Sequence, residues 1–431
     1  MQHSSIVKLL KGVYLIAYLI AYHPKGYPNI KTSMAVKELP WCKPTKSITD
    51  KSEEEEGTLS SSETLSSTKS SPPPNPTQGV LTPNSELASI LTNFPATDFS
   101  FGYGSGVFSQ TASEQSSSSE AKASSAEAKA DPAAPLPMLD LILSTSNSHE
   151  FHSQNLVNHP SHYSGLARLF GPSFITYIQR NTGAAVWFNP LCEVPISSTD
   201  NTSKTRVIKY GIVETSDLLA DLKTWEHLYL AGRMHKPIGI ISDNYSDEIR
   251  EAYEGNLGFG LAAGLLTLND EEGGNNNDAE KSKHLPLDEL FTSITNLSYA
   301  GDPRMKVGGE DPNKVLKLVS SKGQHERFTK LYTPSLQQLH KKGLISYDSK
   351  SSAIEWDINC KTTRATLLSA LPPKVSTLSS SNHSSLAINS AIATIVSKSA
   401  RSQSVKGALT AGLVRSLVYA RAKFIKGGVL S

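Results

Sequence analysis

Runs of apolar residues with strand or helix spacing mark the start of the folded part of the chain. Leu87, Ile90 and Leu91 have helical spacing, and DFSFGYGSGVF (residues 98–108) predicts a short strand that ends in glycines. MLDLIL (residues 138–143) predicts a second strand, which we expect to neighbour the first in space. TRVIKYGIVE (residues 205–214) alternates as a third strand, and residues 216–234 have helical spacing, with Ser216 as a candidate N-cap.

The pattern changes in the second half of the chain. Apolar spacing is mostly helical over residues 243–342, and GLISYDSKSSAIEWDI (residues 343–358) predicts a hairpin. Helices followed by a two-stranded wing are typical of a winged-helix-like domain. The sequence therefore predicts an α+β protein with a first domain at 83–240, a helical winged-helix-like domain at 241–375 and a basic tail at 376–431.

Polar, low-complexity segments interrupt these elements. Residues 43–82 contain EEEE, many serines and PPPNP, and we expect a disordered tether there because few large apolar residues are present. A Ser/Ala-rich stretch at 111–135 predicts a long surface insertion, and an Asn-rich stretch at 270–283 predicts another.

The first 42 residues are basic and contain one acidic residue, Glu38. Their apolar run, residues 13–22, is shorter than the roughly 20 residues that span a bilayer. This pattern favours a mitochondrial targeting region over a membrane anchor, although the run also resembles the core of a signal peptide.

Composition narrows the class of protein. The chain has 431 residues, a formal net charge of +2 and three cysteines. Cys42, Cys192 and Cys360 lie far apart and lack CxxC spacing, so they predict neither a disulfide framework nor a zinc site. A reducing compartment is the simpler interpretation.

The glycines of FGYGSGVF are the first candidate for chemistry. Gly102, Gly104 and Gly106 can expose backbone N–H groups without interference from a Cβ, as a phosphate-binding turn requires. A Walker loop needs GK[ST] and a dinucleotide fingerprint needs GxGxxG, and neither fits. The turn of the DNA polymerase beta-like nucleotidyltransferases fits in part: Tyr103, Gly104 and Ser105 supply the turn, and Asp140 supplies a metal-binding carboxylate on the next strand.

That template usually places a second acid two residues later, where this chain has Ile142. The alternative is an ordinary Gly/Ser turn that closes a hairpin, with Asp140 as a strand-end carboxylate. The residues alone leave both interpretations open.

Seven blocks in order resemble one family, the mitochondrial translocator assembly and maintenance proteins, which are peripheral CDP-diacylglycerol synthases (phosphatidate cytidylyltransferases). The blocks are FGYGSGVF, MLDLIL, HSQNLVNHPSHYS, IKYGIVETSDLLADL, LYLAGRMHKPI, LSYAGDPRM and SVKGALTAG. The resemblance implies Mg²⁺-dependent transfer of CMP from CTP to phosphatidic acid, with release of pyrophosphate, for cardiolipin biosynthesis. It also implies a peripheral protein on the matrix side of the mitochondrial inner membrane, built from a nucleotidyltransferase domain, a winged-helix domain and a C-terminal membrane-binding helix.

The resemblance and the chemistry together give a set of expected site residues. Asp140 and Lys209 are the catalytic candidates, and Asp140 and Asp221 are the candidate metal ligands, with Glu214 or Asp217 as alternatives to Asp221. Arg233, Lys236 and Arg304 are candidates for binding lipid phosphate or pyrophosphate. The candidate nucleotide-binding residues are Tyr103, Gly104, Ser105, Gly106, His152, Asn155 and Tyr210. Zinc binding by the four histidines His149, His152, His159 and His162 is disfavoured, because no cysteine accompanies them. Hydrogen bonds to substrate from His152, Asn155, Asn158 and Tyr163 are favoured instead.

The C-terminal region is basic and amphipathic. No acidic residue follows Asp357, and residues 409–426 place apolar and basic side chains on opposite helical faces. We expect an interfacial helix on anionic lipid, with binding residues Leu413, Arg415, Leu417, Lys423, Phe424 and Lys426. The alternatives are packing of this helix on the protein itself and binding of RNA; the lack of interleaved aromatic residues disfavours RNA, so no nucleic-acid partner is expected.

The sequence therefore favours an enzyme with CTP, phosphatidic acid, Mg²⁺ and the inner membrane as its partners. The rival hypothesis is a non-catalytic maintenance factor of the inner-membrane protein translocase, because Ile142 replaces an expected acid. A third hypothesis keeps the chemistry but has RNA or protein as acceptor. Self-association stays open.

Overall fold

The computed structural model describes residues 86–104, 106–108, 137–196, 204–268, 283–306, 314–320, 322–357, 360–380 and 383–410. The predicted targeting region, the tether, the Ser/Ala-rich insertion, Ser105 and all six predicted membrane-binding residues lie outside these ranges. The predictions made for them stay predictions.

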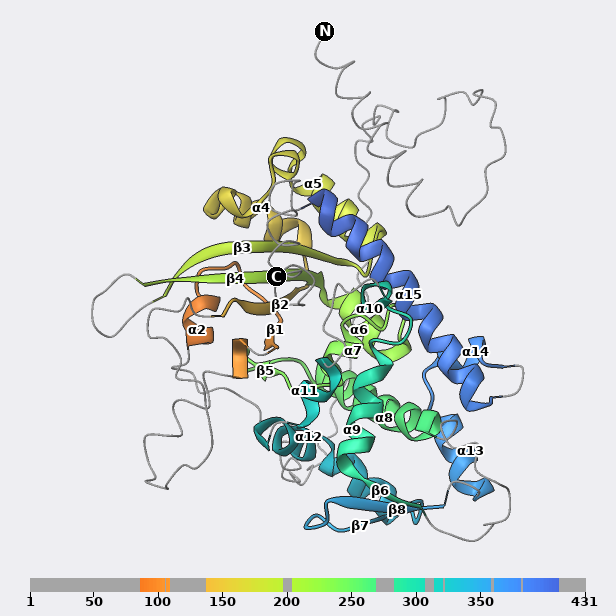
Figure 1. The fold of residues 1–431 in the computed structure, drawn as a ribbon. Helices are drawn as coiled ribbons and strands as arrows, with labels where there is room; N and C mark the ends of the chain where they lie inside the picture. Colours follow the sequence, from red (N-terminus) through yellow and green to blue (C-terminus); the bar gives the residue numbers. More distant parts are fainter. Residues whose placement is uncertain are drawn as a thin grey trace, which may run out of the picture. The chain divides into compact units, whose positions relative to one another are not determined.

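A five-stranded mixed sheet is the centre of the first half (Figure 1). Its order is β3 (Val186–Ile196), β4 (Lys204–Glu214), β2 (Leu139–Thr145), β1 (Phe99–Tyr103) and β5 (Gly239–Ile240). β2 and β4 are parallel, and the other neighbours are antiparallel. The predicted pairing of the first two strands is confirmed, and so is the third strand at 205–214.

Each face of this sheet is covered by a different set of helices. Leu139, Leu141 and Leu143 belong to a smaller hydrophobic cluster, which also holds residues of α2 (Glu86–Leu91), α4 (Ser148–Asn158) and α5 (Gly165–Asn181). Ile142, between them in the strand, belongs to a larger cluster with α6 (Thr215–Thr224), α7 (Ala231–Met234) and α8 (Asp247–Thr267). The split follows from the alternation of side chains along a strand. A short 3-10 helix (Pro160–His162) joins α4 to α5.

The second half is mainly helical and contains a small sheet. Its helices are α9 (Leu287–Leu297), α10 (Pro303–Lys306), α11 (Lys314–Ser320), α12 (Lys322–Lys341), α13 (Lys361–Ser369) and α14 (Pro373–Leu378). The sheet has the order β6 (Lys283–Pro286), β8 (Ala353–Trp356), β7 (Ser346–Tyr347). Antiparallel pairing of β7 and β8 confirms the predicted hairpin. The larger cluster includes residues of this half as well as the sheet, so both predicted domains share one core.

The last described helix corrects part of the prediction of a basic tail. α15 (Ser385–Thr410) packs against the body through the apolar side chains of Ile388, Ala391, Ile392, Ile395 and Val396. Its last turns reach the first half of the chain, where Gln403 accepts a hydrogen bond from the Ala184 amide at 3.0 Å and donates one to the Val186 carbonyl at 3.1 Å. Residues 385–410 are therefore part of the folded body.

Lys406 also connects α15 to the first half. Its ammonium group donates to the carbonyls of Ile178, Gln179 and Thr182, at and just beyond the C-terminal end of α5. The last carbonyls of an α-helix lack a backbone N–H partner from a following turn, so Lys406 caps α5. Within the described part of the chain, no helix is both long and apolar enough to cross a membrane.

Candidate functional site

A tight glycine turn follows β1. Gly104 has a φ of +84°, which residues with a Cβ rarely adopt, and its carbonyl accepts a hydrogen bond from the Val107 amide at 3.2 Å. A Cβ on Gly106 would lie 2.5 Å from the Met138 carbonyl oxygen. The turn thus needs glycine at both positions, at 104 for its backbone angles and at 106 for close packing against the start of β2.

Asp140, Lys209 and Tyr103 meet beside this turn. In the sheet register Asp140 lies opposite both Tyr103 and Lys209, and all three side chains are on the face of the larger cluster. The Lys209 ammonium lies 3.1 Å from Asp140 Oδ1, and the Tyr103 hydroxyl donates to the same oxygen at 3.5 Å. A Cβ on Gly104 would lie 3.9 Å from Asp140 Oδ2, so that oxygen faces the turn. The two predicted catalytic residues are therefore in direct contact.

Aromatic rings and arginines extend the site towards the helices. The Arg233 guanidinium lies 3.9 Å from the ring centre of Tyr229 and 5.3 Å from that of Tyr103, and it donates to the Tyr229 carbonyl at 2.6 Å. Burial raises the pKa of Tyr103. No carboxylate is paired with Arg233 among the described residues, so it is a cation suited to a bound anion.

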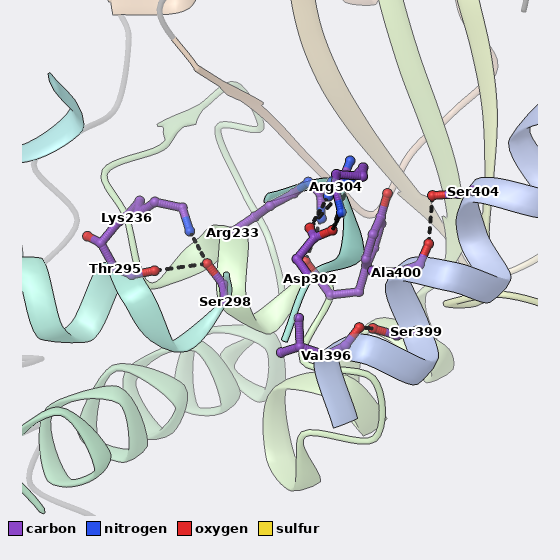
Figure 2. A network of polar contacts seen from close by, with 11 residues as sticks. Arg233, Lys236, Thr295, Ser298, Asp302, Arg304, Val396, Ser399, Ala400 and Ser404 are labelled. Carbon is purple, nitrogen blue, oxygen red and sulfur yellow. Dashed lines mark hydrogen bonds and ion pairs between the residues drawn. The ribbon is translucent and has the colours of Figure 1, made fainter. Parts of the chain in front are cut away.

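The positive charge of Arg304 also affects Tyr229. Burial alone would raise the pKa of Tyr229, but the positive charges of Arg233, Lys209 and Arg304 together lower it. Figure 2 shows Arg233 reaching towards the pair formed by Asp302 and Arg304. The structure thus gathers three predicted cations around one phenol. Tyr229 was missed by the sequence analysis, although its position four residues before Arg233 was a usable signal.

Asp221 has a structural role that corrects its prediction as a metal ligand. It is buried, and its two carboxylate oxygens accept hydrogen bonds from five successive backbone amides, residues 227–231, at 2.7–3.1 Å. These bonds use the acceptor capacity that a metal would need. They fix the loop that carries Tyr229 and leads into α7, and with it Arg233.

The two alternatives to Asp221 are at the other end of the sheet. Glu214 lies opposite Thr145, five residues along the parallel ladder from Asp140 and Lys209, which is about 16 Å at 3.3 Å per residue. Glu214 and Asp217 both pair with Arg180 there. Neither can share an ion with Asp140.

The remaining test of a metal site is Asp140 itself. Its side chain is 27% exposed, and Oδ2 faces the glycine turn. Mg²⁺ is commonly held by one or two carboxylates together with substrate phosphates and water. Among the described residues no group of three or more His, Cys, Asp or Glu side chains could hold a metal ion. The geometry fits an ion held by Asp140 and the substrate, and does not fit a site built from protein side chains alone.

Three predicted nucleotide-binding residues are on the wrong face of the sheet. His152, Asn155 and Tyr210 are fully buried in or beside the smaller cluster, away from Asp140. The Tyr210 hydroxyl accepts from Asn155 at 2.9 Å, and the His152 ring contacts Tyr163 at 2.9 Å and Gln179 at 2.7 Å. Burial lowers the pKa of His152 to about 4, which keeps it neutral. These side chains form a polar network inside the core and do not reach a substrate on the opposite face.

Lys236 is also used within the protein. Its ammonium group donates to the Gly232 carbonyl and, at 2.7 Å, to the Ser298 hydroxyl, so it links α7 to the end of α9 (Figure 2). Cations at helix C-termini stabilise the exposed carbonyls there. The contact favours a structural role over the predicted phosphate-binding role.

Comparisons with known proteins cover this whole site. A family model described as "Phosphatidate cytidylyltransferase, mitochondrial" matches residues 87–385 and 375–426. Curated proteins of that name are similar over most of the chain. The one from Saccharomyces cerevisiae is 33% identical over 342 residues, covering 79% of this chain and 70% of the relative. Those from Xenopus laevis and Bos taurus are 32% and 33% identical, each covering 78% of this chain and 93% and 92% of the relative.

Proposed function

The chain belongs to the mitochondrial phosphatidate cytidylyltransferase family, a family of nucleotidyltransferase enzymes, and from this premise we propose its reaction and the roles of its residues. The proposed reaction transfers CMP from CTP to phosphatidic acid, giving CDP-diacylglycerol and pyrophosphate. A phosphate oxygen of phosphatidic acid forms a bond to the α-phosphorus of CTP. The bond from that phosphorus to the bridging β-phosphate oxygen breaks, and pyrophosphate leaves with the electron pair.

The observation that carries the proposal is the contact of Asp140 with Lys209 and Tyr103 beside the Gly104–Gly106 turn. In-line transfer requires the CTP phosphates to be held still while negative charge accumulates on the leaving pyrophosphate. Backbone N–H groups of the glycine turn would bind these phosphates. Lys209, 16% exposed, would offset part of their charge.

Magnesium bound to Asp140 and the CTP phosphates would neutralise further charge on the reacting groups. The ion pair with Lys209 holds the Asp140 carboxylate at the glycine turn. Tyr103 restricts the rotamer of Asp140 from the opposite strand.

Arg233 and Arg304 would bind the phosphate of phosphatidic acid. Guanidinium groups suit phosphate because their N–H donors form paired hydrogen bonds with two oxygens. Stacking on Tyr229 and Tyr103 fixes the Arg233 side chain before a substrate arrives. This placement would put the attacking oxygen on the side of the site that faces the helices.

We also propose that the enzyme acts on the matrix face of the mitochondrial inner membrane. The support is the basic, amphipathic pattern of residues 409–426 and the mitochondrial names of its relatives. The folded body is described as far as Thr410, so a membrane-bound segment at residues 411–426 would follow it directly in the chain.

The test is CDP-diacylglycerol formation from labelled CTP and phosphatidic acid with magnesium, comparing wild type with Asp140→Asn. We expect the substitution to reduce turnover at least 100-fold, as for loss of a group that stabilises the transition state. Circular dichroism and the melting temperature serve as folding controls. Folded wild-type protein that binds lipid but gives no product would contradict the proposal.

A further inference from the structure

Asp302 is a buried carboxylate in the loop between α9 and α10; it lies in the LSYAGDPRM block, but no role was predicted for it from the sequence. Its side chain is 1% exposed, whereas the side chain of its partner Arg304 is 36% exposed. Burying a carboxylate is costly unless it is paired and hydrogen-bonded. A function in fixing its partner would account for its position.

We propose that Asp302 is a positioning residue, which holds the Arg304 guanidinium beside Arg233 so that both groups face the phosphate of phosphatidic acid. The inference rests on the proposed function and adds to it a residue that does not itself touch the substrate.

The contacts between the two side chains define the orientation of the guanidinium. Arg304 Nε donates to Asp302 Oδ1 and Oδ2 at 3.0 and 3.1 Å, and Arg304 Nη2 donates to Oδ2 at 2.6 Å. The Arg304 backbone amide donates to Oδ1 at 2.9 Å. Because Asp302 binds both the guanidinium and the backbone amide of Arg304, the Arg304 side chain keeps one rotamer. Binding of an anion then costs little further conformational entropy.

The loop beneath Asp302 is itself fixed by α15. Gly301 has a φ of +71°, and a Cβ there would lie 2.7 Å from the Ala393 carbonyl oxygen, so the loop packs directly on the helix backbone. The Asp302 amide donates to the Tyr299 carbonyl at 3.1 Å. Figure 2 shows the Asp302–Arg304 pair beside α15 residues Val396 and Ala400. The loop that carries the Asp302 carboxylate is therefore rigidly supported by α15.

The charge of Asp302 has a second effect. Arg233, Arg304 and Lys209 all act on Tyr229, and like charges at such a place repel one another. The buried carboxylate of Asp302, paired with Arg304, offsets part of this repulsion.

A double-mutant cycle on the full-length protein tests the proposal: wild type, Asp302→Asn, Arg304→Ala and the double variant. Binding of a soluble short-chain phosphatidic acid is measured by calorimetry, and KM and kcat are measured in parallel. We expect Asp302→Asn to weaken phosphatidic acid binding roughly 5-fold, in line with loss of a charge-assisted pair, and to leave kcat within about twofold. In the Arg304→Ala background the same substitution should have no further effect on binding, since Asp302 acts through Arg304.

The control is Asp247→Asn, which breaks a local, exposed ion pair with Arg250 at the start of α8 and should change nothing. If Asp302→Asn does not fold, phosphatidic acid binding by Arg304→Lys tests the proposal instead. Lysine keeps the charge but cannot form the fork, so we expect it to bind phosphatidic acid as weakly as Arg304→Ala.

Additive effects in the cycle, wild-type affinity in Arg304→Lys, or no binding by the wild type would each overturn the inference. Failure of the proposed function looks different. Wild-type protein would then make no CDP-diacylglycerol, while the binding cycle would still report whether Asp302 positions Arg304.

Discussion

Replacing Gly106 by alanine tests whether close packing between the glycine turn and β2 sets the geometry of the site. The new Cβ would lie 2.5 Å from the Met138 carbonyl oxygen, about 0.8 Å closer than an ordinary C···O contact of roughly 3.3 Å. The atom it meets is backbone, so a side-chain rotation cannot relieve the clash. Either the turn or the first residues of β2 must shift, and Asp140 follows Met138 by two residues.

Misplacement of a catalytic group by about 1 Å can cost on the order of 100-fold in rate, so we expect Gly106→Ala to lower kcat by roughly 10- to 100-fold. Overpacking of this kind should also lower the free energy of unfolding by about 1–3 kcal/mol. The assay is CDP-diacylglycerol formation at saturating CTP and phosphatidic acid, combined with urea unfolding.

Two other glycines separate the local effect from general effects of the substitution. Gly343 has a φ of +68° and open space around it, so Gly343→Ala should reduce stability through backbone strain alone and leave kcat unchanged. Gly255, within α8, also has open space, and alanine there should stabilise the protein by about 0.5–1 kcal/mol. If Gly106→Ala keeps wild-type kcat, the turn does not set the position of Asp140.

Three further changes probe other parts of the structure. Asp221→Asn should lower the free energy of unfolding by about 3–5 kcal/mol, because an amide cannot accept from five backbone N–H groups; a loss below 1 kcal/mol in thermal or urea unfolding would contradict this role. Burial lowers the pKa of Lys406 to about 7, so between pH 7 and about pH 10 the unfolded chain binds a proton that the folded protein lacks. The free energy of unfolding of wild type relative to Lys406→Met should therefore rise by about 1.4 kcal/mol per pH unit in this range, and a flat difference would refute it. Deleting residues 411–431 leaves the Lys406 contacts in place and should weaken sedimentation with cardiolipin-rich vesicles more than CTP binding; unchanged sedimentation would exclude a membrane anchor there.

The sequence was sufficient to predict three strands of the larger sheet and the β7–β8 hairpin, and its two catalytic candidates, Asp140 and Lys209, are in contact. Glycine spacing and the apolar flanks of Asp140 are local properties, and the alternation of residues 205–214 placed Lys209 on a strand. The prediction of Tyr210 as a site residue was inconsistent with this alternation, because neighbours in a strand point to opposite faces. Only one of Lys209 and Tyr210 can lie beside Asp140, and the structure selects Lys209.

Other parts of the site depend on contacts that a single sequence does not encode locally. Asp221 was predicted as a metal ligand because Ile142 cannot supply the second acid. Its actual partners are backbone amides, which any residue type provides, so the sequence gives no sign of them. In α15, by contrast, the signal was present. Ile388, Ala391, Ile392 and Ile395 have the spacing of a buried helical face, and the basic composition of the tail obscured it.

The contacts of α15 with the first half of the chain affect how the protein can fold. Gln403 bonds to Val186 across 217 residues of sequence, and Lys406 bonds to Ile178 across 228. Contacts between residues so far apart in sequence form late, because a long loop must close first. During synthesis the end of α5 and the start of β3 therefore lack their α15 partners until the last part of the chain is made, and their carbonyls can bond to other donors. The folded body is therefore complete only when α15 has formed. A chain truncated before α15 would leave the carbonyls at the end of α5 and the start of β3 exposed, which favours chaperone binding or aggregation.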